Sequence, residues 1–507
     1  MLADLGHFSA LGANVENSNR LSTKMLGQLT LCAAALAMLL AAGCGGGGTS
    51  TTGTGPVQGE NSLVTVVGSS AANDQITRFT VQLTSLVLTD KAGTSVSLIS
   101  APQQVEFMHL NGNAEPIVTV SVPQDVYTSA TATVQSATFV CAAQVSGSDS
   151  IAEYAASTNP ATVQLPQPLT VDGTTTALSL QLLVSQSASF PSTCYTTTPP
   201  PISVTPTFNL TAMTVSAQPT NAANGRMTAL EGLVQAVSGA NTFTVTAADS
   251  VPNGGTSNPT IWRLSTSGTT VFQGTGNVAG LAAGMPVDMD GNLQSDGSVL
   301  ATRVAVLDPN TTDLTVNSGP LFQIPASIPL LDQLNQIAEG SQLYINGWPV
   351  YSFGNATTFA TWDGLTNVAS LPFSASFTAA NMVPGQMTSV TSHVTSVGNY
   401  PTFVPATVVT LMPQTIDATV SAVTTQGNFT EYTVTLAPYD FFPQFAVQAG
   451  QTTLLTNPQQ VVVYADSNAQ VLSTPAAGST ARFTGVIFND NGTLRMDCTQ
   501  VSAGVTE

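Results

Sequence analysis

Short segments in which apolar and polar residues alternate recur along most of this 507-residue chain. In Phe79-Thr80-Val81-Gln82-Leu83, for example, every second residue is apolar. Alternation with a period of two is typical of strands that bury one face. The 41 glycines and 30 prolines interrupt these segments at short intervals, as turns do in sandwiches and barrels. The pattern therefore predicts an all-β fold.

The composition restricts the partners of the chain. Charged residues make up 7% of the sequence, and 9 Lys and Arg face 28 Asp and Glu, for a formal charge of −19. Nucleic-acid binding needs a clustered basic surface, so we expect no nucleic-acid partner. The 43% of apolar residues can fill several cores, and at about 150 residues per domain the length suggests three or four domains.

The N-terminal segment has the order of an export signal. Arg20 and Lys24 precede an apolar run, and Leu39-Leu40-Ala41-Ala42-Gly43 leads directly to Cys44. This order resembles the lipobox of bacterial lipoproteins. The resemblance implies that residues 1–43 are a signal peptide, that Cys44 is acylated and becomes the mature N-terminus, and that the protein is lipid-anchored to a membrane of the bacterial cell envelope, facing the periplasm or the surface.

An uncleaved membrane-spanning helix is the alternative for this segment. Gln28 and Thr30 interrupt the apolar run, which leaves it shorter than the roughly 20 residues that a span needs. Residues 44–61 are rich in Gly, Ser and Thr, so we expect a flexible linker between the anchor and the folded part.

The first folded region is expected at residues 62–215, where the segments suffice for a β-sandwich. The patterns over 79–90 and 105–110, followed by Pro123 and Tyr127, resemble the bacterial family called domain of unknown function 4382. That resemblance implies a sandwich of carbohydrate-binding-like shape and supplies no catalytic residues.

A second kind of unit then repeats, each time with a turn centred on glycine between strands. The turns are found at 281–285, 383–387 and 475–478. They divide the rest of the chain into a barrel unit at 227–308, a divergent unit at 312–413 and a third at 415–503. The pattern resembles the small-barrel family of envelope proteins called domain of unknown function 5666. We therefore predict two or three small OB-like β-barrels.

One helix is expected inside the divergent middle unit. Ser327 is a candidate N-cap, Pro329 lies in the first turn, apolar residues follow at helical spacing, and Gly340 comes after the end. This pattern predicts a short helix near 328–339.

Three cysteines lie after the lipobox. In an oxidising envelope Cys141 and Cys194 are candidates for a disulfide. Cys498 shares a strand face with Leu494 and Met496, which favours a buried free thiol.

The sequence contains no catalytic motif that we recognise. The two histidines after Cys44, His109 and His393, fall in different expected domains, and no Gly-x-Ser-x-Gly occurs. We interpret His109 as a structural residue of a strand. The sequence therefore predicts that the protein is not an enzyme and uses no cofactor.

A group of oxygen-bearing side chains is a weak calcium candidate. It consists of Asp288, Asp290, Asn292 and Asp296. The ligand ladder and terminal Glu of an EF-hand are missing, so a hairpin turn with Gly291 is the preferred explanation.

Aromatic residues gather in the middle unit. If exposed, Trp348, Tyr351 and Trp362 could form a platform for a sugar or another partner, and if buried they are core residues, which we favour.

These observations together predict a lipid-anchored envelope protein with a non-catalytic binding or structural role, whose ligand is a glycan or an envelope protein. The alternative is an envelope hydrolase that cleaves polysaccharide with a pair of carboxyl groups.

Overall fold

In the computed structural model, the chain forms two compact units, residues 1–53 and 54–507. The structure describes residues 56–57, 59–71, 76–145, 148–158, 160–188, 203–250, 258–309, 317–323, 341–345, 350–353, 355–362, 364, 368–383, 385–392, 404–437, 440, 442–443 and 455–504. All of these belong to the second unit. The signal peptide, Cys44 and the helix expected near 328–339 lie outside the described residues.

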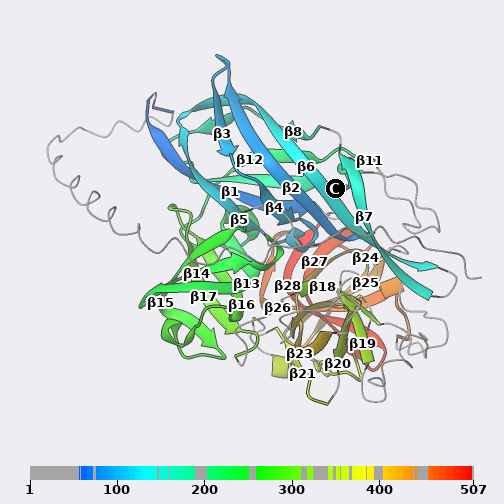
Figure 1. Ribbon diagram of the computed structural model, residues 1–507. Helices are drawn as coiled ribbons and strands as arrows, with labels where there is room; N and C mark the ends of the chain where they lie inside the picture. The colour runs from blue at the N-terminus through cyan, green and yellow to red at the C-terminus, as the bar shows by residue number, and fades with distance from the viewer. Residues whose placement is uncertain are drawn as a thin grey trace, which may run out of the picture. The chain divides into compact units, whose positions relative to one another are not determined.

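The fold is all-β, as the sequence predicts (Figure 1). Two sheets form a sandwich between Asn61 and Met213. The five-stranded sheet has the order β5 (Glu115–Pro123), β1 (Asn61–Ala71), β10 (Ala177–Leu183), β12 (Thr207–Met213) and β8 (Thr162–Gln164). The other sheet has the order β11 (Ser203–Val204), β7 (Ser148–Thr158), β6 (Asp125–Val145), β2 (Ile76–Asp90) and β3 (Ser95–Ile99), with β4 (Gln103–Glu106) on β2 and β9 (Leu169–Val171) on β6.

The sandwich core lies between these two sheets. Val64 and Leu180 come from the first sheet and Phe79 and Phe139 from the second, and all four side chains are fully buried. The alternation noted in Phe79–Leu83 therefore places Phe79, Val81 and Leu83 in one core.

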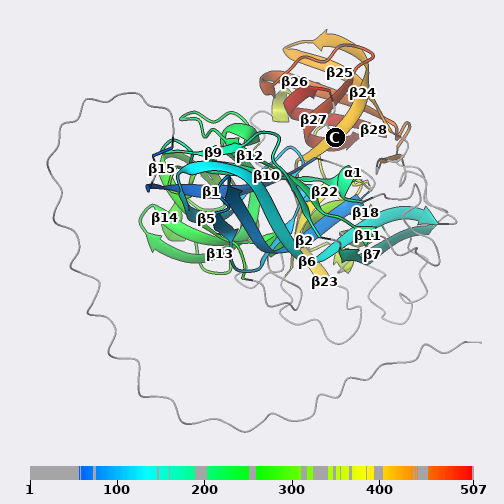
Figure 2. The ribbon, with the colours of Figure 1, turned by 90° about the horizontal axis from the view of Figure 1, so that it is seen from above.

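Two closed five-stranded barrels follow. The first barrel has the order β13 (Arg226–Gly239), β14 (Thr242–Ala247), β15 (Ile261–Gln273), β17 (Val299–Val306) and β16 (Pro286–Leu293). The last barrel, seen in Figure 2, has the order β24 (Gln414–Gln426), β25 (Phe429–Leu436), β26 (Gln460–Val471), β28 (Thr493–Ala503) and β27 (Thr480–Asp490). In sequence order, the third strand of each barrel pairs in parallel with the fifth: β15 pairs with β17, and β26 pairs with β28.

The middle unit closes a ring of the same topology. Its strands are β18 (Asn317–Gln323), β19 (Ser341–Ile345), β20 (Val350–Phe353), β21 (Thr358–Thr361), β22 (Met387–Ser392) and β23 (Val404–Leu411). β18, β19, β20, β23 and β22 pair in turn, and β22 pairs back to β18. β20 and β21 both pair in parallel with β23, so together they replace the single third strand of the other barrels.

The glycine-centred turns of the repeat share one backbone conformation. Gly284, Gly385 and Gly478 have φ values of 87°, 98° and 86°. This left-handed region favours glycine because a side chain would collide with the backbone there. The repeat seen in the sequence is therefore a repeat of structure.

Helix contributes little to this fold. Among the described residues α1 (Val184–Ser187) and short 3₁₀ turns such as η1 (Met108–Leu110) and η2 (Ala222–Asn224) are present. In this part of the chain, no helix has the length and apolar character needed to cross a membrane.

Candidate functional site

A cavity of about 240 Å³ lies against the last barrel. Its walls come from Pro413 and strands β25, β26, β27 and β28 of the last barrel and from three other segments. These are the sandwich loop at Gly112 and Asn113, residues between Asn221 and Thr228, and the group of Trp362, Gly364, Ser370 and Leu371. A concave site with a few converging polar groups is the usual form of a ligand pocket.

Amide side chains are frequent in the walls of this cavity. They are Asn113, Asn221, Asn468, Gln470 and Gln500. Each amide offers both hydrogen-bond donors and acceptors, so this lining suits a ligand with many hydroxyl or amide groups. The buried aromatic residues Trp362 and Phe429 also border the cavity.

Two carboxyl groups, Asp466 and Asp497, face the cavity from adjacent strands of the last barrel. Asp466 begins the bulge of β26 and accepts hydrogen bonds from the Asn468 N–H at 2.7 Å and the Ala469 N–H at 3.1 Å. Its second oxygen accepts from the Asn468 side chain at 2.9 Å. The Asp466 carboxylate is therefore engaged in holding its own turn.

Asp497 has a different environment. Burial, and after it the negative charge of Asp466, together raise the pKa of Asp497 to about 7. No group among the described residues donates a hydrogen bond to this carboxyl. Near neutral pH, Asp497 can therefore either donate or accept a hydrogen bond from a ligand.

The residues of the calcium candidate do not form a ligand group. Asp288 and Asp290 lie on β16, and both bind the buried guanidinium of Arg303, Asp290 at 2.8 Å from its Nε. Burial raises the pKa of Asp288 to about 6, against the opposing charge of Arg303. The two carboxyl groups hold the pKa of Arg303 above its ordinary value. In the described part of the chain, no three His, Cys, Asp or Glu residues gather as a metal site.

The hairpin turn lies later than the sequence suggests. Asn292 still belongs to β16, and the turn runs from Gln294 to Gly297, with the Gly297 N–H donating to the Gln294 carbonyl at 3.0 Å. Asp296 caps this turn, because its carboxylate accepts from the N–H of Ser298 at 2.9 Å and from its hydroxyl at 2.6 Å.

Trp362, which follows β21 of the middle unit, is buried against the first barrel. Its side chain is 6% exposed, the guanidinium carbon of Arg303 lies 5.1 Å from its ring centre, and its Nε1 donates to Asp288 at 2.9 Å. These contacts leave no exposed aromatic face on Trp362. Of the other platform residues, Trp348 lies outside the described residues, and only the backbone of Tyr351, in β20, is described.

The cysteines are only partly described. Cys141 lies in β6, where its backbone alone is described, and Cys194 lies outside the described residues, so the disulfide stays a prediction. Cys498 is a buried free thiol, as the sequence predicts, and burial raises its pKa.

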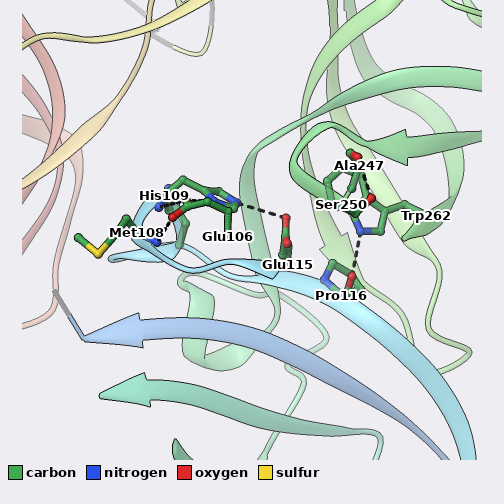
Figure 3. A network of polar contacts seen from close by, with 9 residues as sticks. Glu106, Met108, His109, Glu115, Pro116, Ala247, Ser250 and Trp262 are labelled. Atoms are coloured by element: carbon green, nitrogen blue, oxygen red, sulfur yellow. Dashed lines mark hydrogen bonds and ion pairs between the residues drawn. The ribbon is translucent and has the colours of Figure 1, made fainter. Parts of the chain in front are cut away.

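His109 lies in the 3₁₀ turn η1, not in a strand as expected from the sequence. Figure 3 shows its ring between two carboxyl groups: Nδ1 lies 2.9 Å from Glu106 and Nε2 lies 3.3 Å from Glu115. Burial acts to raise the pKa of Glu106, but hydrogen bonds and the charge of His109, with the Phe79 N–H, lower it below its ordinary value. Nearby, Trp262 Nε1 donates to the Pro116 carbonyl at 2.9 Å.

Sequence reasoning missed Asp466 and Asp497. Strand register aligns them with Ser267 and Leu300 of the first barrel, since Ala465 pairs with Cys498 as Thr266 pairs with Ala301. Two acidic residues in one repeat against uncharged residues in the other is a signal that an alignment of the repeats could have found.

No curated protein and no solved structure matches this chain. Residues 231–305 match the family described as Domain of unknown function (DUF5666). The match begins within β13 and ends within β17. The first barrel is therefore the part of this chain that is similar to that family.

Proposed function

We propose that this chain is a bacterial lipoprotein, anchored through Cys44 to a membrane of the cell envelope, and that its folded part binds a glycan without acting on it chemically. The order of basic, apolar and small residues before Cys44 supports the anchor. The Gly-, Ser- and Thr-rich linker at 44–61 supports a folded part that is held away from the membrane. The resemblance of residues 62–215 to domain of unknown function 4382 fits the same role.

The cavity beside the last barrel is the observation that carries the binding role. Amide groups and the Asp497 carboxyl line it, and sugar hydroxyls pair with groups of both kinds. The buried side chains of Trp362 and Phe429 add apolar surface to the wall of the cavity.

A glycan array probed with the detergent-solubilised full-length chain tests this role, followed by calorimetry on the sugars that bind. Asp497→Leu introduces the residue type of Leu300, which occupies the matched position in the first barrel. It should weaken binding by about tenfold or more, because a hydrogen-bonding group is lost. Ser267→Ala, in the first barrel at the position matched to Asp466, is the control and should bind as the wild type does. Absence of any bound glycan, or full binding by Asp497→Leu, would contradict the proposal.

One observation favours a second candidate, a carboxylate-dependent glycan hydrolase. A carboxyl with a pKa of about 7 beside another carboxyl is the arrangement of a general acid and its partner. The three hydrogen bonds that Asp466 accepts within its own turn argue against it, because they leave this carboxylate about one of its four lone-pair sites for work as a nucleophile or base.

Turnover measurements separate the two candidates. Incubation of the bound glycan with the wild type, Asp466→Asn and Asp497→Asn should release no shortened product if the protein only binds. Product formation by the wild type that is lost in both variants would favour the hydrolase.

The anchor has its own test. Mass spectrometry of the protein from membrane fractions should find an acylated Cys44 as the first residue, and Cys44→Ser should move the protein to the soluble fraction. An unmodified Cys44 in the membrane fraction would contradict the lipoprotein assignment.

A further inference from the structure

The sandwich loop from Met108 to Pro116 makes hydrogen bonds to both closed barrels. The hydroxyl of Thr415, in the last barrel, donates to the Asn111 carbonyl at 2.8 Å. The hydroxyl of Thr228, in the first barrel, donates to the Asn113 side chain at 2.8 Å. The position of this loop therefore affects both junctions, and Gly112 and Asn113 also form one wall of the cavity.

His109 is the residue that ties this loop to its flanking strands. Its Nδ1 lies 2.9 Å from Glu106, at the end of β4, and its Nε2 lies 3.3 Å from Glu115, at the start of β5. Its carbonyl accepts a hydrogen bond from the Asn113 side chain at 3.4 Å. The ring thus connects two carboxyl groups at the two ends of one loop.

Glu106 is a fixed partner for this ring. It is 4% exposed, and its carboxylate accepts from the N–H groups of Phe79 at 2.7 Å, Met108 at 2.9 Å and His109 at 3.0 Å. Three N–H donors stabilise the charged form of a buried carboxyl. Glu115 is also buried, at 8% exposure.

The two contacts define the protonation state that the ring needs. A neutral imidazole has one N–H donor and one lone pair, so one carboxylate would face a lone pair, whereas an imidazolium donates to both. We propose that a doubly protonated His109, bound between Glu106 and Glu115, positions the loop that joins the sandwich to both barrels and forms a wall of the cavity. The consequence for the cavity rests on the proposed binding function.

The protonation state can be measured directly. Of the three histidines in the sequence, His7 lies in the proposed signal peptide, so the ¹⁵N-labelled imidazole resonances of the protein can be assigned with His109→Gln and His393→Gln variants. At pH 7 both ring nitrogens of His109 should carry a proton. A neutral ring with one protonated nitrogen would overturn the proposal.

The positioning role needs a second readout. Hydrogen exchange of amides 108–116 should speed up by about tenfold or more in His109→Gln, and His109→Lys, which keeps a positive charge, should restore part of the protection. His393→Gln is the control and should leave these amides unchanged. Wild-type exchange in His109→Gln would overturn the role.

If His109→Gln does not fold, Glu115→Gln provides a second test of the same proposal. Removing this one charge should let Nε2 lose its proton at a lower pH than in the wild type, and an unchanged titration would contradict the two-carboxylate arrangement. If the wild type binds no glycan, the proposed function fails, while the ring protonation and the exchange rates still decide the role of His109.

Discussion

The first and last barrels have the same strand order and register but use the same face differently. Strand register places Arg303 and Asp290 of the first barrel where the last barrel has Gln500 and Thr484. In the first barrel this face is closed by an ion pair beneath Trp362. In the last barrel Gln500 and Thr484 line the cavity. A repeated backbone can therefore carry a barrel contact in one copy and line a cavity in another.

The same comparison applies to the bulge in the third strand. In both barrels four residues are skipped in the parallel pairing, 267–270 in the first and 466–469 in the last. Hydroxyl groups support the first bulge, where the Ser267 N–H donates to the Thr270 hydroxyl at 2.9 Å. The Asp466 carboxylate supports the last bulge. The bulge itself does not require an acidic residue, and we propose ligand binding as the reason for the acidity of the last barrel.

Breaking one ion pair in each barrel should give the largest difference. Arg303→Met should cost about 3–5 kcal/mol of unfolding free energy, because it leaves Asp288 and Asp290 buried without their counter-charge. Arg482→Met breaks a less buried pair with Asp417 and should cost about 1 kcal/mol. Chemical denaturation of the two variants measures both values, and equal losses would contradict this account of the two faces.

Close backbone approach should affect both barrels alike. An added Cβ at Gly485 would lie 2.1 Å from the Asp497 carbonyl oxygen, and one at Gly291 would lie 2.8 Å from the Leu300 carbonyl oxygen. Gly291→Ala and Gly485→Ala should each lose roughly 2–3 kcal/mol in thermal or chemical unfolding, because the contact is with backbone that cannot turn away. A large loss in one barrel alone would show that the shared register does not impose the same constraint.

The Asp497 charge should destabilise the last barrel at neutral and alkaline pH. Its pKa is raised from 3.8 to about 7, so the folded state binds more protons than the unfolded state between these values, and stability falls as the pH rises through this range. Asp497→Asn should therefore raise the unfolding free energy on the order of 2 kcal/mol at pH 8 and show no gain from this source below pH 3.8. Denaturation over a pH series measures the gain, and a pH-independent difference would contradict it.

The bulge residues should give the smallest effect. Asp466→Ala removes a carboxylate that accepts three hydrogen bonds and should cost about 1 kcal/mol. Ser267→Ala, in an exposed bulge, should change the stability by less than about 0.5 kcal/mol. Urea denaturation of both variants provides the comparison, and a greater loss for Ser267→Ala would reverse the ranking of the two bulges.

The fold could largely be predicted from the sequence because its signals are local. Alternation in Phe79–Leu83 and glycine at positions 284, 385 and 478 depend on the backbone of a few neighbouring residues. Asp288 and Asp290 were assigned to a turn with Gly291, although they continue the alternation of β16. Polar residues that face out of a strand look like turn residues when the partners that bury them are distant in the chain, as Trp362 is from Asp288 and Arg303 from Asp290.

The candidate site could not be predicted because it depends on contacts between distant segments. Asp466 and Asp497 are brought together by the parallel pairing of β26 with β28, which are separated in the sequence by β27. His109 was expected in a strand, since nothing local shows that Glu106 and Glu115 would face both of its ring nitrogens. Asp466, Asp497 and His109 can therefore be recognised as site residues only from their tertiary contacts.

Hydrogen exchange of the full-length chain with and without its best-binding glycan tests whether the cavity beside the last barrel binds the ligand. The glycan should slow exchange at 466–470 and 497–500 in the last barrel and leave the matched segments 267–271 and 300–303 of the first barrel unchanged. Protection in the first barrel alone, or in neither barrel with glycan bound, would contradict the assignment of ligand binding to this cavity.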